Sequence, residues 1–259
     1  MNYEEDKPIS YCGIFGIYGS ETASAQAYYG LHALQHRGQE ASGIVTRSFN
    51  GDNRAHFNII KGEGLVSEVF ADHNLLTDVL FGDSAIGHNR YSTTGSSKSR
   101  KNIQPFMVNY RMGNLAIGHN GNLTNAKELR EELVNEGAIF QTTSDTEVIL
   151  HLIARSKLDN QIDQIMEALR RIEGAYCLVI LTDDKLIAAR DPLGFRPLSL
   201  GKLEDAFLVA SETCAFDIQR AEFLREVEAG EMIVIDDESI KTKVIKSFRI
   251  KEVPEPQKH

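Results

Sequence analysis

Short apolar runs alternate with turn residues along most of this chain, which is the pattern of β-strands. The first run is CGIFGIYG, at residues 12–19. Nine further runs follow it, at residues 42–47, 56–60, 84–91, 114–120, 176–181, 185–190, 206–211, 231–236 and 241–248. We therefore predict a chain rich in β-structure.

Apolar residues return at helical spacing in four segments, residues 22–36, 124–137, 144–156 and 161–174. Gly38 stands where the C-cap of the first helix is expected, and Asn125 where the N-cap of the second is expected. Ser144 and Glu147 match the spacing of a capping box. Strands and helices do not alternate regularly, so we predict an α+β fold in which helices cover antiparallel sheets.

Composition and charge narrow the class of protein. The 259 residues are 42% hydrophobic and 25% charged, as in globular proteins, and the length fits one large domain or two small ones. Lys plus Arg number 28 and Asp plus Glu 37, so the net charge is 28 − 37 = −9, which argues against a nucleic-acid partner. No apolar run reaches the roughly 20 residues that span a bilayer, and the amino terminus does not resemble a signal peptide. A cytoplasmic protein that binds no membrane is expected.

The three cysteines give no framework for a disulfide or a metal. Cys12, Cys177 and Cys214 are odd in number, lie far apart and have no CxxC spacing, so no metal site is expected. Cys177 lies within a predicted strand and Cys214 at a predicted helix start, and both are interpreted as packing residues. His88 and His119 are interpreted as core or supporting groups and not as metal ligands.

Cys12 begins the first apolar strand, directly after the polar residues 1–11. One interpretation is a small buried side chain. The other is a nucleophile that becomes the first residue once residues 1–11 are removed. Its freed α-amine would then have a pKa of about 7.7–8.0 and could take the thiol proton without help from a histidine.

Four polar clusters stand at the predicted ends of strands and helices. They are LQHRGQEASG (34–43), HNRYSTTG (88–95), GHNGNLTN (118–125) and TTSDTE (142–147). Each has an ordinary explanation as a turn or a helix start. Taken together they indicate one functional site.

With CGIFGIYG, RDPLGFRPL (190–198) and ASETCAFD (210–217), these clusters resemble, in the same order, the glutaminase domain of the amidophosphoribosyltransferase family, a class II glutamine amidotransferase. The resemblance implies the N-terminal-nucleophile hydrolase fold, a four-layer αββα sandwich of two antiparallel sheets. It also implies a removed leader at residues 1–11, a glutaminase domain at residues 12–248, and a linker at residues 249–259 toward a phosphoribosyltransferase domain. The segment at 190–198 is expected to be structural.

The resemblance further implies the catalytic groups. Cys12 would attack the side-chain amide of glutamine, and Arg37 would support it nearby. Asn120 and the backbone N–H of Gly121 would form the oxyanion hole.

Substrate binding is assigned by the same resemblance. Arg90, helped by Thr93, would hold the α-carboxylate of glutamine, and Asp145 would hold the α-ammonium. A free amino acid carries both charges, so its site needs one fixed cation and one fixed anion.

The implied reaction is glutamine hydrolysis that supplies ammonia to phosphoribosyl pyrophosphate, which gives 5-phosphoribosylamine in the first step of purine biosynthesis. The loop that binds phosphoribosyl pyrophosphate is absent from the sequence, so a phosphoribosyltransferase domain or subunit is the expected partner. This chain is expected to hold no cofactor. A complete family member, expected to be a homo-oligomer, would use Mg²⁺ and in some branches a 4Fe-4S cluster, whose ligands would lie beyond residue 259.

Two alternatives remain open. One is the glutaminase domain of another class II enzyme, such as glucosamine-6-phosphate synthase or glutamate synthase, although the LQHRGQE segment argues against it. The other is a catalytically silent regulatory module that keeps its leader.

Overall fold

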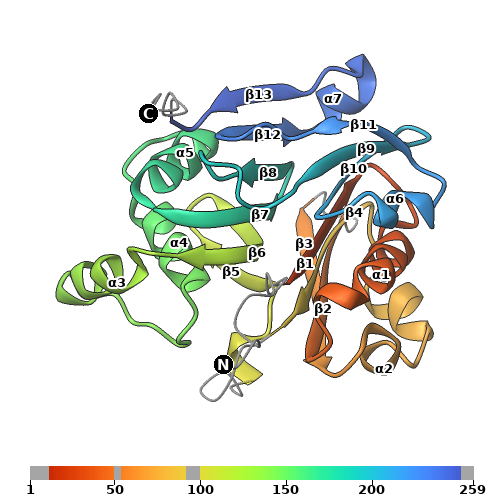
Figure 1. The fold of residues 1–259 in the computed structure, drawn as a ribbon, viewed down its shortest axis with the longest axis horizontal. Coiled ribbons are helices and arrows are strands. Elements are labelled where there is room, and N and C mark those ends of the chain that lie inside the picture. The colour runs from red at the N-terminus through yellow and green to blue at the C-terminus, as the bar shows by residue number, and fades with distance from the viewer. Residues whose placement is uncertain (1–11, 50–53, 92–99, 252–259) are drawn as a thin grey trace, which may run out of the picture.

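The structure, a computed structural model, describes residues 12–49, 54–91 and 100–251 (Figure 1). The predicted leader, Thr93 and residues 252–259 of the predicted linker lie outside these ranges. Two sheets stack face to face, and helices cover the outer face of each sheet (Figure 1). The predicted four-layer α+β sandwich is therefore confirmed.

The first sheet has seven strands, and all of its strand pairs are antiparallel. Its order is β11 (Glu222–Glu226), β9 (Ser199–Leu203), β10 (Ala206–Ala210), β1 (Gly13–Tyr18), β4 (Ser84–Arg90), β2 (Ala41–Phe49) and β3 (Ala55–Glu63). Its outer face is covered by α1 (Ala23–Ala33), α2 (Val66–Val69) and α6 (Cys214–Asp217), with a short 3₁₀ turn, η1 (Gln35–Arg37), after α1. Strand β1 is thus central, between β10 and β4.

The second sheet has six antiparallel strands. Its order is β13 (Lys246–Arg249), β12 (Glu231–Ile235), β8 (Leu186–Arg190), β7 (Gly174–Thr182), β6 (Gly113–Leu123) and β5 (Phe106–Tyr110). Its outer face is covered by α3 (Ala126–Asn135), α4 (Thr146–Arg155) and α5 (Gln161–Arg171). Short segments complete the described chain: η2 (Leu75–Val79), η3 (Arg100–Asn102) and α7 (Asp237–Thr242).

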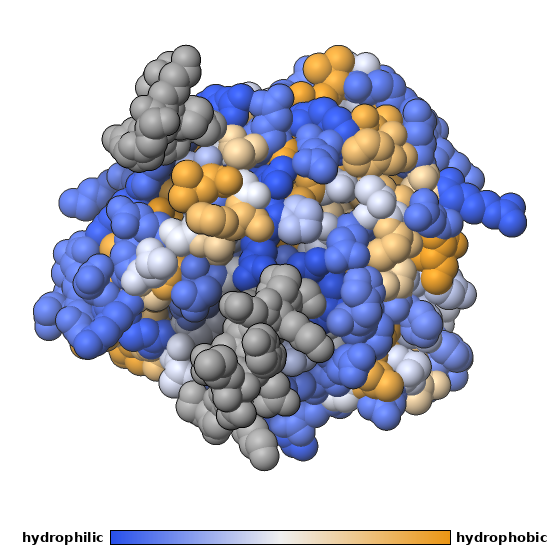
Figure 2. All heavy atoms as spheres, in the orientation of Figure 1, coloured by the Kyte–Doolittle hydropathy of each residue, from blue (hydrophilic) through white to orange (hydrophobic). Residues whose placement is uncertain are grey.

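Three hydrophobic clusters fill the three interfaces between the four layers. The middle cluster joins the sheets, with Ile14 and Val45 from one sheet packed in the same cluster as Ala116 and Val179 from the other. Cys177 is fully buried in this cluster, in agreement with its interpretation as a packing residue. On the surface, hydrophilic residues dominate the face in Figure 2, and apolar residues gather there only in separate patches. Within the described residues, no helix combines the length and apolar character needed to cross a bilayer.

Two of the predicted helix ends are wrong. Gly38 is not the C-cap of α1, which ends five residues earlier at Ala33: it follows η1 as the C-cap of that turn and is extended, with φ −160°. Ser144 and Glu147 form no capping box, because Asp145 is the N-cap residue of α4 and its side chain makes no capping bond. The Glu147 carboxylate instead accepts bonds from the backbone N–H groups of Gln141 and Thr142. The carboxylate of Glu147, which the local pattern assigned to the end of the helix, therefore binds the preceding loop.

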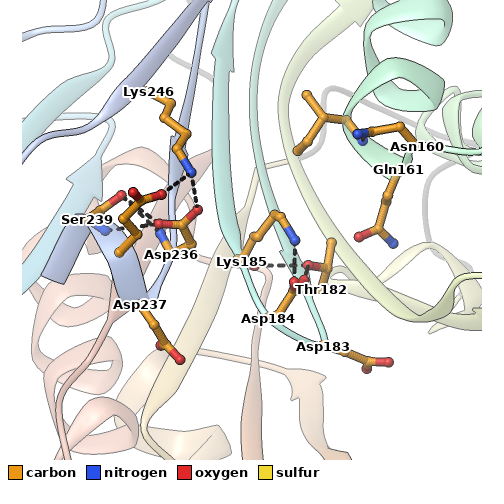
Figure 3. A network of polar contacts seen from close by, with 12 residues as sticks. Asn160, Gln161, Thr182, Asp183, Asp184, Lys185, Asp236, Asp237, Ser239 and Lys246 are labelled. Carbon is orange, nitrogen blue, oxygen red and sulfur yellow. Dashed lines mark hydrogen bonds and ion pairs between the residues drawn. The ribbon is translucent and has the colours of Figure 1, made fainter. Parts of the chain in front are cut away.

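Three strands were not predicted and one was predicted too long. Strands β5, β9 and β11 have only five residues each, which is too short to show a clear apolar alternation. Strand β11 also carries three charged residues at the sheet edge. The segment predicted as a strand at 241–248 begins in helix α7. Asp236 caps that helix by accepting from the N–H and hydroxyl of Ser239 and is held by Lys246 from β13 (Figure 3).

The segment at 191–198 connects β8 to β9. The buried carboxylate of Asp191 accepts bonds from the N–H groups of Leu193 and Phe195, at 3.0 and 3.2 Å, and from that of Tyr176 in β7. A single side chain therefore organises the turn, which agrees with a structural function for this segment.

Candidate active site

Cys12 lies immediately before the central strand β1, where the sheet fixes its position. The next residue, Gly13, pairs with Asn89 of β4, and Cys12 itself has φ +49°, which is uncommon for a residue with a side chain. The carbonyl oxygen of Cys12 accepts a hydrogen bond from Nε of Arg37 at 2.8 Å. The half-buried thiol is thus held at the edge of a rigid framework.

A cavity of about 260 Å³ opens at this thiol. It is lined by Cys12, His88, Arg90, Tyr91, Asn102, Gln104, Asn122, Thr143, Ser144 and Asp145. These residues come from the start of β1, the end of β4, the loop before β5, strand β6 and the N-terminus of α4. The structure therefore brings the predicted cation Arg90 and the predicted anion Asp145 to the same cavity as the predicted nucleophile.

The charges around the cavity act on the thiol of Cys12. Burial raises the pKa of this thiol, and the negative charge of Asp145 raises it further. The backbone N–H of Tyr91 and the charges of Arg90 and Arg37 lower it, but the net direction is upward. In this chain the thiol therefore stays protonated at neutral pH.

Asp145 is held as a carboxylate. Burial alone would raise its pKa, but His119 and the N–H groups of Leu123 and Thr146 lower it below the ordinary value. Its Oδ2 accepts from the N–H of Leu123 at 2.9 Å, and its Oδ1 lies 3.5 Å from Nδ1 of His119. A fixed negative charge is what an ammonium group requires.

His88, which lines the cavity, and His119 are both buried and support this arrangement. Burial lowers the pKa of His88 to about 3, so the ring is neutral at working pH. Its Nε2 lies 3.0 Å from the carbonyl oxygen of His119 and therefore donates to it. Nδ1 of His119 lies 3.1 Å from the hydroxyl of Thr146, and these contacts fix the strand next to Asp145.

Asn120 in β6 is fully buried, and neither its amide nitrogen nor its amide oxygen has a hydrogen-bond partner among the described residues. Strand β6 crosses the first sheet here: a side chain built at Gly118 would contact Ile14 at 3.7 Å, and His119 meets His88. Ile14 of β1 pairs with His88 of β4, and these residues are two positions along the chain from Cys12 and Arg90, respectively. Asn120 therefore lies at the same end of the sandwich as Cys12 and Arg90. A buried amide without hydrogen-bond partners costs about 1–3 kcal/mol, which makes Asn120 a candidate for a functional role.

Gly121 follows with φ +157°, and a Cβ there would lie 2.0 Å from the carbonyl oxygen of Ala175. Only glycine fits at this point of β6. Gly38 is required for a different reason, since a Cβ there would lie 2.6 Å from the backbone carbon of Arg90. The loop around Gly38 therefore packs directly on the end of β4 that presents Arg90.

Sequence reasoning missed several residues of the site. Asn102 and Thr143 bond each other, with Nδ2 of Asn102 donating at 2.8 Å, and Gln104 accepts from the N–H of His119 at 2.7 Å. These side chains tie together loops that are distant in sequence, and no local pattern marks them. Glu212 was also missed, although it lies in the ASETCAFD motif.

Glu212 holds Arg37 in place. The guanidinium of Arg37 is almost fully buried and donates to Oε1 of Glu212, while its Nε bonds Cys12. Burial raises the pKa of Glu212, but Arg37 and His36 lower it overall, so the group is ionised. Glu212 therefore positions the arginine that contacts the backbone of Cys12.

We predict that Glu212→Gln lowers the free energy of unfolding by about 1–2 kcal/mol, because Arg37 keeps a buried charge without its carboxylate. It should also lower kcat about tenfold for the glutamine hydrolysis that the sequence resemblance implies. The partial exposure of Glu212 limits the loss of stability. Urea unfolding and steady-state kinetics measure both. Glu226→Gln, which removes an exposed partner of Arg190, is the control and should change neither. Wild-type stability in Glu212→Gln would contradict the positioning role.

Comparisons with known proteins agree with this geometry. Residues 88–217 match the family described as "Glutamine amidotransferase domain". The chain is 51% identical over 238 residues to amidophosphoribosyltransferase 2, chloroplastic, of Arabidopsis thaliana, covering 92% of this chain and 41% of the relative. It is 50% identical over 233 residues to amidophosphoribosyltransferase of Bacillus subtilis, covering 89% and 47%. The chain thus spans less than half the length of these relatives.

Solved structures give the same result. Glutamine phosphoribosylpyrophosphate amidotransferase from B. subtilis superimposes with a TM-score of 0.82 at 48% identity, covering 93% of this chain and 49% of that chain. A glutamine aminotransferase class-II domain protein from Silicibacter pomeroyi superimposes with a TM-score of 0.57 at 13% identity, covering 93% and 100%, which shows a shared fold.

Proposed function

Because the chain belongs to the family of glutamine amidotransferase domains, we propose that it hydrolyses the side-chain amide of glutamine, with Cys12 as the nucleophile. One observation carries this proposal: Cys12, Arg90 and Asp145 line a single small cavity, and the charges of Arg90 and Asp145 both act on the thiol of Cys12. A free amino acid carries one carboxylate and one ammonium, which this pair of charges complements. Thr93, proposed to assist Arg90, lies outside the described residues.

The proposed reaction has two stages. Sγ of Cys12 attacks the side-chain amide carbon of glutamine, and the thiol proton passes to the α-amine of Cys12 once residues 1–11 are removed. The negative oxygen that forms accepts bonds from Nδ2 of Asn120 and the N–H of Gly121, which lowers the barrier. The C–N bond then breaks, the proton leaves with ammonia, and a thioester remains. Water attacks the thioester and releases glutamate and the free thiol.

In the whole protein, the proposed destination of the ammonia is phosphoribosyl pyrophosphate, on a phosphoribosyltransferase domain or subunit. The names of the relatives support this assignment. The residues described here do not fit a 4Fe-4S cluster, because the three cysteines occupy a cavity edge, the core between the sheets and the start of α6. Mg²⁺ and any cluster would belong to other parts of a complete, homo-oligomeric enzyme.

Glutamate and phosphoribosylamine assays on the leader-free chain test the proposal. With glutamine and phosphoribosyl pyrophosphate supplied, we expect glutamate and free ammonia but no phosphoribosylamine. Absence of glutamate would favour a silent module, and phosphoribosylamine made by this chain alone would overturn the division of activities.

The proposed compartment is the cytoplasm, and the plant relatives named chloroplastic make a plastid the competing location.

The chain with residues 1–11 attached should react slowly with iodoacetamide at Cys12. The raised pKa of the thiol leaves less thiolate at pH 7 than in free cysteine, about tenfold less for each pKa unit. Removing residues 1–11 should speed alkylation near pH 8, where the α-amine becomes a base. Peptide mass spectrometry separates Cys12 from Cys214, the internal control. An unprocessed chain that hydrolyses glutamine at full rate would refute the self-contained nucleophile.

A further inference from the structure

A histidine, a carboxylate and a thiol converge beside the active site. His36 belongs to the 3₁₀ turn η1 and Glu212 to the turn after β10, and Cys214 is the first residue of α6. One ligand atom from each lies within 4.8 Å of the others. Nε2 of His36 is 2.9 Å from Oε2 of Glu212, and Sγ of Cys214 is 3.8 Å from the same oxygen.

The hydrogen bond made by Nδ1 of His36 leaves the lone pair of Nε2 facing this cluster. Nδ1 of His36 lies 3.1 Å from the carbonyl oxygen of Ala33, which only accepts, so Nδ1 carries the proton. In the neutral ring Nε2 then has a lone pair aimed at a carboxylate oxygen. Two acceptors at 2.9 Å require a cation or an added proton between them. Histidines that bind metals commonly donate their other N–H to a carbonyl in this way.

We propose that His36, Glu212 and Cys214 bind a divalent zinc-class ion, with a fourth position open to water. Nitrogen, carboxylate oxygen and thiolate sulfur are all common zinc ligands, at about 2.0–2.3 Å, and a tetrahedral set places them about 3.3–3.6 Å apart. The separations of 2.9 and 3.8 Å from Oε2 of Glu212 need to change by only a few tenths of an ångström, and the remaining pair, Nε2 of His36 and Sγ of Cys214, lies within 4.8 Å. The half-exposed side chain of His36 leaves the site open to solvent.

Charge and proton balance are simple. When the ion binds, the thiol of Cys214 releases its proton to bulk water, and so does Nε2 of His36 if it is protonated. No group changes oxidation state. The thiolate and the carboxylate of Glu212 then offset the two charges of the ion. Arg37 can keep Oε1 of Glu212, the oxygen that the ion does not need.

The site is linked to the nucleophile through two contacts. Glu212 binds Arg37, and Arg37 binds the carbonyl oxygen of Cys12. An ion on Oε2 reduces the negative charge that Arg37 experiences and weakens its hold on Cys12. We therefore expect the ion to inhibit glutamine hydrolysis, a consequence that rests on the proposed function, whereas the binding itself does not.

Co²⁺ is a suitable probe, because a cobalt–thiolate bond gives a near-ultraviolet charge-transfer band. The experiment uses untagged Cys12→Ala protein, which lacks the other thiol near the site. We expect one Co²⁺ per chain with this band, displacement by Zn²⁺, loss of the band in Cys12→Ala/Cys214→Ser, and at least about tenfold weaker binding in Cys12→Ala/His36→Ala. No stoichiometric band, or a band that persists without Cys214, overturns the proposal and leaves His36 as a protonated partner of Glu212.

Inhibition is measured separately, on leader-free enzyme with Cys12 present. Zn²⁺ alone should lower glutamate production, and a chelator should restore it. Cys214→Ala should keep the activity measured in chelator and require at least about tenfold more Zn²⁺ for the same inhibition. Equal zinc sensitivity in Cys214→Ala would mean that zinc acts on Cys12 and would remove the regulatory part of the proposal. An inactive enzyme with an intact cobalt band would indicate failure of the proposed function and not of the metal site.

Discussion

Replacing Cys12 with alanine should abolish glutamine hydrolysis and leave the chain folded. Loss of a covalent nucleophile costs on the order of 10⁴–10⁶ in kcat, because neither the oxyanion hole nor substrate binding can replace the attacking atom. The side chain is half-buried and precedes β1, so its loss removes little packing. Glutamate release and a thermal unfolding curve measure the two results.

Cys177→Ala is the matched control, because it removes the same atom from the core between the sheets. It should lower the free energy of unfolding by about 1 kcal/mol, the scale of one buried group of this size, and leave kcat near the wild-type value. If Cys12→Ala retained activity while remaining folded, the nucleophile would have to be another group.

Asn120→Ala should lower kcat by about 10²–10³ and leave KM for glutamine nearly unchanged, because an oxyanion donor acts mainly in the transition state. The same substitution should leave stability unchanged or raise it, since the buried amide has no partner among the described residues to lose. A fall in kcat combined with no fall in melting temperature is the expected result. A large loss of stability would show that Asn120 is a structural residue.

Asp145→Asn provides the contrast for that experiment. The amide can still accept from the N–H of Leu123, so the loop should keep its conformation, but the charge for the substrate ammonium is lost. KM should therefore rise more than kcat falls, the result expected when binding is lost equally from ground and transition states. If both variants changed kcat and KM in the same proportion, Asn120 and Asp145 would not have separate roles.

The sequence predicted the parts of the site that lie at the ends of elements. Strands and helices with clear apolar patterns begin or end at or next to Cys12, Arg90 and Asp145. The pattern, together with the resemblance, therefore predicted that these three residues lie close together. Asn102 and Glu212 were not found, because their partners come from distant loops and only the folded chain brings them together.

The same distinction explains the errors in secondary structure. Glu147 has the spacing of a capping box, but it satisfies the backbone of the loop before α4, which local propensity does not register. The cluster around His36 was invisible for a related reason. His36 and Glu212 are separated by 176 residues, so no local pattern marks them as partners, and the spacing of the cysteines argued against a metal.

If residues 1–11 are removed as proposed, the register of β1 determines which peptide bond must be cut to free the α-amine of Cys12. Ile14 pairs with His88 and Phe15 with Ala210, and strands bind β1 on both sides. A one-residue slip would exchange the side chains that face the second sheet, such as Ile14, with those that face the helices, such as Phe15. The paired strand therefore fixes the single residue at which the proposed new amino terminus must lie. A terminus one residue too early would leave Cys12 acylated and its amine blocked, and a terminus one residue too late would remove the thiol.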